Sequence, residues 1–414
     1  ILSMRKITFF IFTILVLFTW RDNSYFFLVQ FRKIFLNFFP FQEYISTCKN
    51  LEDSLNYILP NKKDWSISVL NQNGELIADI NGMIGRIPAS NQKLLTTAFA
   101  LDKLGPNLKL KTKLYFSQKG KYEIIGQGDP DLNYQDIAKL SKAIISHASL
   151  NKISWVKVIL FEEADYNWWN KSWTIKDRNE TYGAPITRLA LTSNANEYSI
   201  LDPLVRFSDI LSQHLTEAGL KVTIKTERYS SFKKKHLNYP LLVINSAPIY
   251  SLLGLANSES HNFTSEVLLK NASNSWDNNK SSKALENWMS TIRLPNSSLE
   301  ISDASGLSRS NKVTTRLLAN LLYSMNQHRY RDYYISSLSI LGQRGTLKQF
   351  DHIDSLSGKF FGKTGTLLGI RAISGYFFTE YGDRYVSIIS NGPMDVNLKY
   401  SQLLGSIYNS RNCN

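Results

Sequence analysis

The hydrophobic pattern of this chain changes period several times along its 414 residues. Alternating apolar positions predict strands at Trp65–Leu70 and Glu75–Ile80, on either side of the turn signal Asn71-Gln72-Asn73-Gly74. Apolar residues then recur at helical spacing from position 94 to position 104, and Gly105-Pro106 ends the pattern. Ser90 stands where the N-cap of this helix is expected.

The segment 109–247 has a mixed pattern and no catalytic constellation, so we interpret it as an insertion. Its predicted strands are Thr112–Phe116, Tyr122–Ile125, Trp155–Phe161, Leu220–Lys225 and Leu241–Ile244, and its predicted helices are Ile137–Ser146 and Val205–Ala218. Helices are then predicted at Ile249–Leu255, Asn262–Lys270, Lys280–Ile292, Thr315–Met325 and Leu398–Tyr408, and strands at Lys359–Lys363, Ile370–Phe378 and Tyr385–Ser390. A sheet that is interrupted and later resumed predicts an α/β (α+β) catalytic domain over 45–108 and 248–414, split by an inserted mixed α/β region at 109–247.

The composition indicates a globular protein with an anionic neighbour. Hydrophobic residues make up 43% of the chain, which is enough for a sizeable core. The net charge of +14 suits nucleic acid, phospholipid headgroups or an acidic wall polymer. Zinc-finger spacing, an RNP-like aromatic motif and a long basic helix are all missing from the sequence, so a nucleic-acid partner is not expected.

The N-terminal segment has the pattern of a targeting sequence. Met4-Arg5-Lys6 precedes an apolar run from Ile7 to Trp20, so residues 1–22 are expected to be a signal peptide or a membrane anchor. The stretch from Phe31 to Phe41 mixes aromatic and basic residues and could lie along a membrane surface or form an ordinary docking helix. In either case we expect an exported protein, periplasmic or anchored at the outer face of the cytoplasmic membrane.

Cysteine is scarce in this chain. Cys48 and Cys413 are too few for a disulfide framework and lie near opposite ends of the predicted folded region. One bridge could join them, but the sequence leaves that open. We expect neither residue to be catalytic.

Ser90 and Lys93 are the first candidates for chemistry. They are three residues apart at the start of a predicted helix, so their side chains share one face. A serine hydroxyl becomes a good nucleophile when a nearby base takes its proton, and a lysine can be that base if burial or another cation lowers its pKa. The pair alone is weak evidence, because the same spacing also occurs at Ser149/Lys152, Ser154/Lys157 and Ser231/Lys234.

Two later motifs supply the missing groups. Ser260-His261-Asn262 offers a hydroxyl that can pass a proton and an amide that can hold Lys93 or a substrate amide. Lys363-Thr364-Gly365-Thr366 offers a second cation that would keep Lys93 partly neutral, hydroxyls for a carboxylate, and a glycine that allows close approach of a strand to substrate. His261 is interpreted as a solvated or packing histidine, because Lys93 already fills the role of base.

With these three motifs in this order, the sequence resembles the penicillin-binding, serine D-alanyl-D-alanine carboxypeptidase/endopeptidase family known as peptidase family S13. Further matching segments are Pro88–Gly105, Gly126–Leu132, Tyr182–Pro185, Asp303–Ser308 and Lys363–Tyr376. The resemblance implies a DD-peptidase/β-lactamase-like transpeptidase domain with an antiparallel sheet flanked by helices. It also implies an enzyme that acts on peptidoglycan stem peptides, is acylated by β-lactam antibiotics such as penicillins, and requires no metal or cofactor.

The resemblance also implies a role for each motif residue. Ser90 would be acylated, Lys93 would be its base, and Ser260, Asn262 and Lys363 would complete the catalytic set. Thr364, Gly365 and Thr366 would bind substrate, and the backbone N–H groups of Ser90 and Thr366 would form the oxyanion hole. Gln127 and His261 depart from the family pattern, at positions where we expect no proton transfer.

Two rival functions remain open from the sequence. A β-lactamase would share the motifs, but the 170 positions between Ser90 and Ser260 exceed the interval in compact β-lactamases. A catalytically weak penicillin-binding or wall-binding module would keep the fold without turnover, and the presence of Lys93, Asn262 and Lys363 argues against it. The oligomeric state is not predicted.

Overall fold

The structure is a computed structural model, and it describes residues 48–410, with gaps at 60, 119, 233–238, 296–297, 351–353 and 393–396, together with Cys413. The predicted signal peptide or anchor and the aromatic, basic stretch that follows it lie outside the described residues. Within the described part of the chain, no helix combines the length and the apolar character needed to cross a bilayer.

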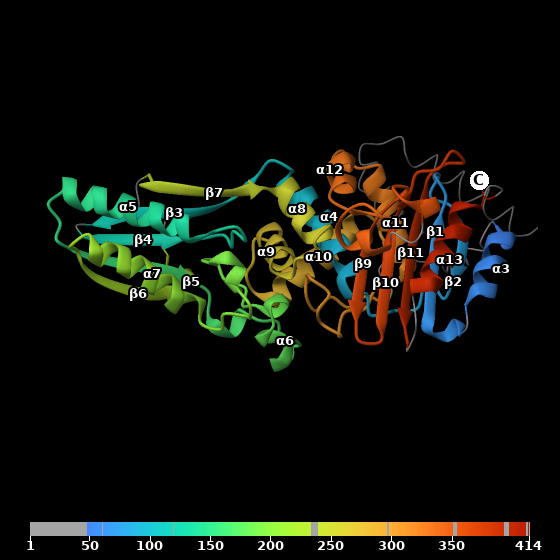
Figure 1. Ribbon diagram of the computed structural model, residues 1–414, viewed down its shortest axis with the longest axis horizontal. Helices are drawn as coiled ribbons and strands as arrows, with labels where there is room; N and C mark the ends of the chain where they lie inside the picture. The colour runs from blue at the N-terminus through green and yellow to red at the C-terminus, as the bar shows by residue number, and fades with distance from the viewer. Residues whose placement is uncertain are drawn as a thin grey trace, which may run out of the picture. The chain divides into compact units, whose positions relative to one another are not determined.

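A six-stranded sheet organises the part of the chain that carries the three motifs. Its strand order is β2-β1-β11-β10-β9-β8, and every neighbouring pair is antiparallel (Figure 1). The strands are β1 (Trp65–Leu70), β2 (Leu76–Ile80), β8 (Ser339–Ile340), β9 (Phe360–Leu367), β10 (Ile370–Phe377) and β11 (Arg384–Asn391). The antiparallel sheet is therefore confirmed, and the first and last groups of predicted strands lie within it.

Helices cover both faces of this sheet. Alternate residues of one strand point to opposite faces, and accordingly Val386 and Ile388 of β11 lie in one hydrophobic cluster whereas Tyr385 and Ile389 lie in another. The first cluster includes α3 (Lys49–Ile58) and α13 (Asn397–Tyr408). The second includes α4 (Gln92–Leu104), α8 (Ile249–Asn257), α9 (Asn262–Ala272), α10 (Asn278–Thr291), α11 (Thr315–Asn326) and α12 (Arg331–Ser336). Of these helices, α3 and α12 were not predicted.

The segment between the two halves forms a second sheet, ordered β6-β5-β4-β3-β7. The pairs β4–β5 and β5–β6 are parallel, while β3 pairs antiparallel with β4 and β7. The strands are β3 (Lys109–Gln118), β4 (Lys121–Ile125), β5 (Trp155–Glu162), β6 (Lys221–Arg228) and β7 (Leu242–Pro248). Helices α5 (Tyr134–Leu150) and α7 (Pro203–Glu217) pack on it in a third hydrophobic cluster, and the short α6 (Ile175–Asn179) lies in the loop after β5 (Figure 1).

Short 3-10 helices connect many of these elements. They are η1 (Lys62–Asp64), η2 (Ala89–Asn91), η3 (Asp165–Asn167), η4 (Thr181–Gly183), η5 (Thr192–Asn194), η6 (Tyr229–Ser231), η8 (Gly345–Phe350) and η9 (Asp354–Leu356). Two of them, η2 and η4, contribute to the site described below.

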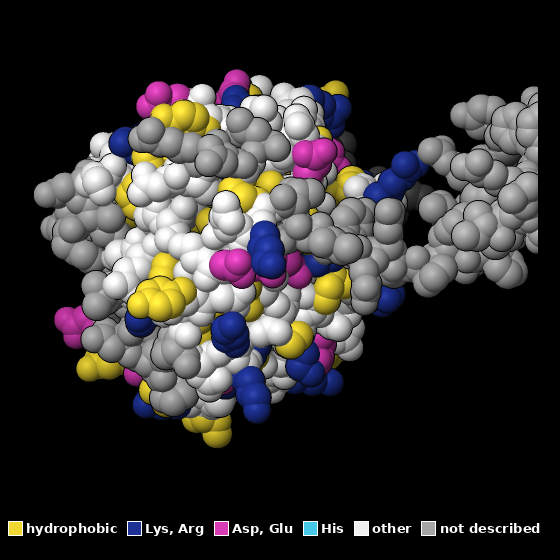
Figure 2. Space-filling model, turned by 90° about the vertical axis from the view of Figure 1, so that its right-hand side faces the viewer, with side chains coloured by type: hydrophobic (Ala, Val, Ile, Leu, Met, Phe, Trp, Pro, Cys, Tyr) yellow, Lys and Arg dark blue, Asp and Glu magenta, His cyan; other side chains and the backbone are white. Residues whose placement is uncertain are grey.

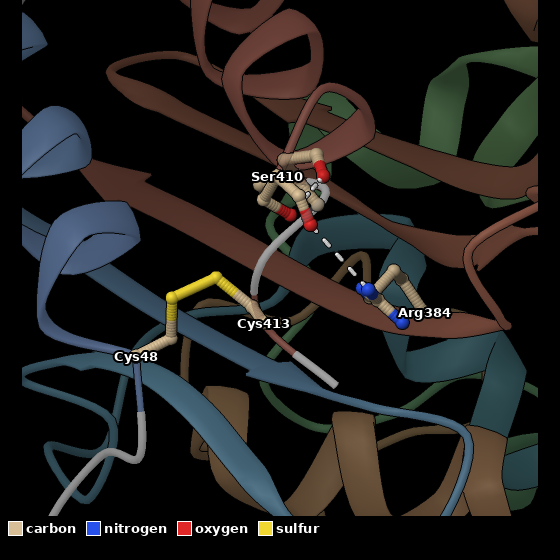
Figure 3. The surroundings of a disulfide bond; sticks show 5 residues. Cys48, Arg384, Ser410 and Cys413 are labelled. Atoms are coloured by element: carbon tan, nitrogen blue, oxygen red, sulfur yellow. Dashed lines mark hydrogen bonds between the residues drawn. A yellow bond between two sulfur atoms is a disulfide. The ribbon is translucent and has the colours of Figure 1, made fainter.

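A disulfide joins Cys48, at the start of α3, to Cys413 (Figure 3). It closes a loop of 365 residues in sequence separation, so the possibility left open by the sequence is decided in favour of the bridge. Close by, the Arg384 guanidinium donates to the Ser410 carbonyl over 3.5 Å (Figure 3). The first helix and the chain end are thereby held against the same sheet.

Positive charge is not gathered on the face that carries α3. Figure 2 shows Lys and Arg side chains there interspersed with acidic and hydrophobic ones. A groove of about 570 Å³ on the second sheet is more basic, because Lys109, Lys111 and Lys113 follow one another along one side of β3. Amide side chains of Asn107, Gln127 and Asn245 complete its polar lining.

Candidate active site

Ser90 lies in the 3-10 turn η2, directly before α4. The predicted N-cap role is wrong, because Asn91 holds that position and no side chain caps the helix. The tight turn places Ala89 at a φ of 47°, a left-handed conformation that is uncommon for residues other than glycine. The Ser90 hydroxyl is therefore not used for capping and is left to contact Lys93.

Lys93, in the first turn of α4, is fully buried, and its ammonium group is surrounded by oxygen atoms. Its Nζ lies 3.0 Å from Ser90 Oγ, 2.7 Å from Asn262 Oδ1 and 2.6 Å from the Ser305 carbonyl oxygen. Three acceptors match the three N–H groups of a protonated lysine.

The second motif lies between α8 and α9. Ser260 has a φ of 61°, again in the left-handed region, and Asn262 is the first residue of α9. The Asn262 amide is held from both ends, since its Nδ2 donates to the Tyr182 carbonyl over 2.9 Å while its Oδ1 accepts from Lys93. Tyr182 belongs to η4, in the loop after β5, so the middle segment of the chain orients this amide.

The third motif lies on β9. Lys363 is fully buried, and its Nζ donates to Ser260 Oγ over 3.0 Å and to the Thr364 carbonyl over 2.9 Å. Its own carbonyl accepts from the Asn91 side chain at 3.1 Å. The three distant motifs thus meet: Ser90, Lys93 and Asn262 form one contact chain, and Ser260 and Lys363 form an adjoining pair.

Strand β9 packs closely on the turn that carries the nucleophile. A Cβ atom added to Gly365 would lie 2.7 Å from the Pro88 carbonyl and 3.0 Å from the Ser90 backbone nitrogen, so only glycine fits without displacement. Thr366, which follows, is exposed. The Thr364 hydroxyl donates to Thr346 Oγ1 over 2.8 Å instead of being free for a ligand.

Part of β9 also has an open edge. The two-residue strand β8 pairs only with Phe361 and Gly362. Among the described residues, the stretch from Lys363 to Leu367 therefore has β10 as its partner on one side and no strand on the other. An extended peptide could add to this edge.

Burial controls the charge of both lysines. It lowers the pKa of Lys93 to about 7, against the opposing effect of the Asp303 and Glu266 carboxylates. Burial also lowers the pKa of Lys363 well below its usual value, and the neighbouring Lys93 lowers it further. The sequence suggested that Lys363 would be the agent that keeps Lys93 neutral, whereas the main cause is desolvation.

The surroundings of His261 do not suit it to act as the base for Ser90. Burial and the nearby Lys93 lower its pKa to about 4, so the imidazole is neutral, and its Nδ1 lies 2.7 Å from Thr264 Oγ1. This packing role agrees with the prediction made from the sequence.

The loop from Asp303 to Ser308 contributes a contact that the sequence did not predict, the Ser305 carbonyl on Lys93. Asp303 folds this loop, because its carboxylate accepts from the backbone N–H groups of Gly306 and Ser308 and from the side chains of Asn311 and Trp173. A backbone carbonyl carries no side-chain signature, so nothing in the sequence of this segment indicated the contact.

A half-buried serine in contact with a buried lysine at the start of a helix, close to a second buried lysine on an antiparallel strand, defines a serine peptidase of the penicillin-binding class. The chain belongs to the D-Ala-D-Ala carboxypeptidase 3 (S13) family, whose family model matches residues 49–203 and 196–402. Membership of this family makes the chain a serine-type D-Ala-D-Ala carboxypeptidase.

Relatives and solved structures agree with this membership. The chain is 23% identical to a D-alanyl-D-alanine carboxypeptidase from Actinomadura sp. (strain R39), over 77% of this chain and 76% of the relative. Its fold is similar to the crystal structure of penicillin binding protein 4 from Haemophilus influenzae, with a TM-score of 0.73, 18% identity and coverage of 87% of this chain and 98% of that one. A predatory peptidoglycan endopeptidase from Bdellovibrio bacteriovorus matches with a TM-score of 0.56 and 18% identity, over 84% and 92% of the two chains.

Proposed function

We propose that Ser90 is the nucleophile and Lys93 the general base of a DD-peptidase that cleaves the terminal D-Ala, or a D-Ala-containing cross-link, of peptidoglycan stem peptides. The observation that carries this is the contact of Ser90 Oγ with a buried lysine whose pKa is lowered to about 7. Such a lysine is neutral in a large fraction of molecules at neutral pH, and only a neutral amine can accept the serine proton.

In the acylation step, Lys93 Nζ takes the proton from Ser90 Oγ, and Oγ forms a bond to the carbonyl carbon of the penultimate D-Ala. The electron pair of the carbonyl moves to its oxygen, which is held by the backbone N–H groups of Ser90 and Thr366. Each oxyanion donor contributes on the order of a hundredfold in rate. The position of β9, against the Ser90 nitrogen, supports this assignment.

In the next step, the peptide C–N bond breaks and the leaving D-Ala amine gains a proton. The Ser260 hydroxyl passes this proton, and its contact with Lys363 at 3.0 Å supports that role. Lys93, which has given its first proton to the leaving amine through Ser260, then takes a proton from a water molecule that attacks the acyl-enzyme carbonyl. The bond from that carbon to Ser90 Oγ breaks, Oγ takes the proton back from Lys93, and the shortened peptide leaves as a carboxylate. A β-lactam would acylate Ser90 through the same first step, with its ring amide opened in place of the peptide bond.

The substrate would extend along the open edge of β9. Backbone groups from Lys363 to Leu367 can pair with the D-Ala-D-Ala segment, and the exposed Thr366 hydroxyl and the Lys363 Nζ are suited to donate to the terminal carboxylate. Gly365 keeps this strand close to the nucleophile. Thr364 acts through its backbone, since its side chain is engaged with Thr346.

We place the enzyme in the periplasm or anchored to the outer face of the cytoplasmic membrane. The Cys48–Cys413 disulfide supports this, because such bridges persist in oxidising compartments. Membrane attachment would depend on the N-terminal segment, and the net charge of +14 is compatible with an anionic wall or headgroup surface.

The test uses the full chain with two reagents. Fluorescent penicillin should form a long-lived covalent adduct that maps to Ser90 by peptide mass spectrometry, and a D-Ala-D-Ala peptide should release D-Ala. Folded protein that forms no adduct and releases no D-Ala would overturn the proposal. Rapid turnover of the antibiotic would assign a β-lactamase instead, and muropeptide analysis would separate carboxypeptidase from endopeptidase action.

A further inference from the structure

Lys93 must present its lone pair to Ser90 in order to act as a base. A neutral amine has two N–H groups and one lone pair, so both N–H groups have to be held elsewhere. Two of the three oxygen atoms around Nζ can do this, Asn262 Oδ1 at 2.7 Å and the Ser305 carbonyl at 2.6 Å. The direction of the lone pair therefore depends on how firmly these two acceptors are fixed.

Asn262 is fixed by its second contact, with the Tyr182 carbonyl. The Ser305 carbonyl belongs to a loop without regular secondary structure, so another group must hold it. That group is the Glu266 carboxylate, whose Oε1 accepts from the backbone N–H groups of Ala304 at 3.1 Å and Ser305 at 2.9 Å. Glu266 is 5% exposed and lies one helical turn after Asn262 on α9.

We propose that Glu266 is a positioning residue for the general base: it clamps the Ala304–Ser305 backbone so that the Ser305 carbonyl holds one N–H of Lys93 and turns the lone pair to Ser90. This inference rests on the proposed function. One helix then fixes both acceptors, Asn262 directly and Ser305 through the clamp.

The charge of Glu266 also affects the pKa of Lys93. The charged groups that face Glu266 are Asp303, Lys270 and Lys93, and Lys93 itself also faces Lys363 and the neutral His261. Burial raises the pKa of Glu266 to about 7, Asp303 raises it further and Lys270 opposes the rise. An ionised Glu266 favours the ammonium form of Lys93, so removal of this charge lowers the pKa of Lys93.

Three variants of the full chain separate the clamp from the charge. Glu266→Ala removes both N–H contacts and should slow penicillin acylation by about a hundredfold, the scale of a misplaced catalytic group. Glu266→Gln keeps an acceptor oxygen without the charge, so it should recover to within about tenfold of the parent and move the pH midpoint of acylation to lower pH. Glu286→Gln is the control, because that carboxylate is paired with Lys283 on α10 and does not contact the site.

The readout is the second-order rate of adduct formation between about pH 5 and pH 9, which brackets the titration of Lys93. Folded Glu266→Ala with the parent rate and midpoint, or Glu266→Gln as slow as Glu266→Ala, would overturn the inference. If Glu266→Ala does not fold, Glu266→Asp decides, because it keeps the charge but shortens the side chain that holds the Ala304 and Ser305 N–H groups: a plateau rate well below the parent's supports the inference, and the parent's plateau rate overturns it. Failure of the parent chain to form an adduct would instead count against the proposed function.

Discussion

The two sheets of this chain bury their strands differently. In the six-stranded sheet helices cover both faces, and β11 is buried at every position but the last. In the five-stranded sheet the edge strand β6 is exposed or half-exposed along its whole length. Lys93 lies on α4, which covers the first sheet, and burial there lowers its pKa to about 7, whereas the exposed edge strand β6 offers no such exclusion of water.

The region of the five-stranded sheet reaches the site by its loops. The Tyr182 carbonyl holds the Asn262 amide, and the indole N–H of Trp173 donates to the Asp303 carboxylate at 2.7 Å. The first contact holds the amide that accepts from Lys93, and the second holds the loop whose Ser305 carbonyl accepts from Lys93. The comparison teaches that one region supplies the reacting groups and the other supplies their supports.

The largest loss of activity is expected when the nucleophile is removed, and two serines with the same spacing to a lysine allow a matched comparison. Ser90→Ala should abolish the penicillin adduct and lower peptide turnover by about four orders of magnitude or more, since it removes the nucleophile. Ser149→Ala is the matched control, because Ser149 precedes Lys152 by three residues but is exposed at the end of α5. A residual adduct in Ser90→Ala, measured by intact mass, would assign the nucleophile elsewhere.

The next prediction concerns the close packing of β9 against the turn that carries Ser90. Gly365→Ala should slow acylation by about a hundredfold, because the added methyl would displace β9 from the Ser90 backbone nitrogen. Gly254→Ala is the control, since a Cβ at that position of α8 meets nothing within 4 Å. Stopped-flow acylation rates for the two variants measure the difference, and equal rates would show that this strand does not help to form the oxyanion hole.

The pH dependence tests whether burial of Lys93 is functional. Because the pKa of Lys93 is lowered to about 7, the reactive neutral amine is lost as pH falls through that value, and acylation at pH 6 should be roughly a tenth of its plateau above pH 8. Glu266 titrates in the same range, so the profile should rise less steeply than a single ionisation. A flat profile between pH 5 and pH 8, measured with penicillin on folded protein, would contradict the assignment of Lys93 as base.

Removal of the disulfide is expected to lower the stability of the protein without changing its acylation. Replacement of Cys48 and Cys413 by serine should lower the free energy of unfolding by about 2–4 kcal/mol, because the bridge restricts a very long loop in the unfolded chain. Acylation at 25 °C should be unchanged, since neither cysteine contacts the site. Chemical denaturation of the oxidised parent and the double variant gives the difference, and a loss of acylation in folded variant would contradict this separation.

The smallest loss of stability is expected when one contact between the two regions is removed. Trp173→Phe removes the indole donor to the buried Asp303 carboxylate and should cost about 1–3 kcal/mol of stability. Acylation should fall by less than about tenfold, because Asp303 keeps three other donors. A loss as large as that of Ser90→Ala would mean that this region does more than support the site.

Much of this arrangement could be predicted from the sequence. Periodicity located the strands of both sheets except the two-residue β8, since a strand and an amphipathic helix impose different spacings on apolar residues. The order of the three motifs brought together Ser90, Asn262 and Lys363, which lie far apart in the chain. These signals are local side-chain patterns, and such patterns are what a single sequence records.

The remaining parts depend on contacts that have no local pattern. The Ser305 carbonyl is a backbone group, and Glu266 is one of several polar residues of α9, none of which the sequence marked as close to Lys93 except Asn262. The 3-10 geometry of Ser90 also could not be distinguished from an N-cap, since serine before an apolar helix is typical of both. The open edge of β9 became visible only when β8 proved to be two residues long.

The bridge between Cys48 and Cys413 also changes what a protease can do to this chain. Any single cut between these two residues, including one within a loop of the five-stranded sheet, yields two fragments that stay covalently linked. A nicked molecule would keep its mass, apart from one added water, until a reductant is present, so cleavage would be seen on a reducing gel and missed on a non-reducing one.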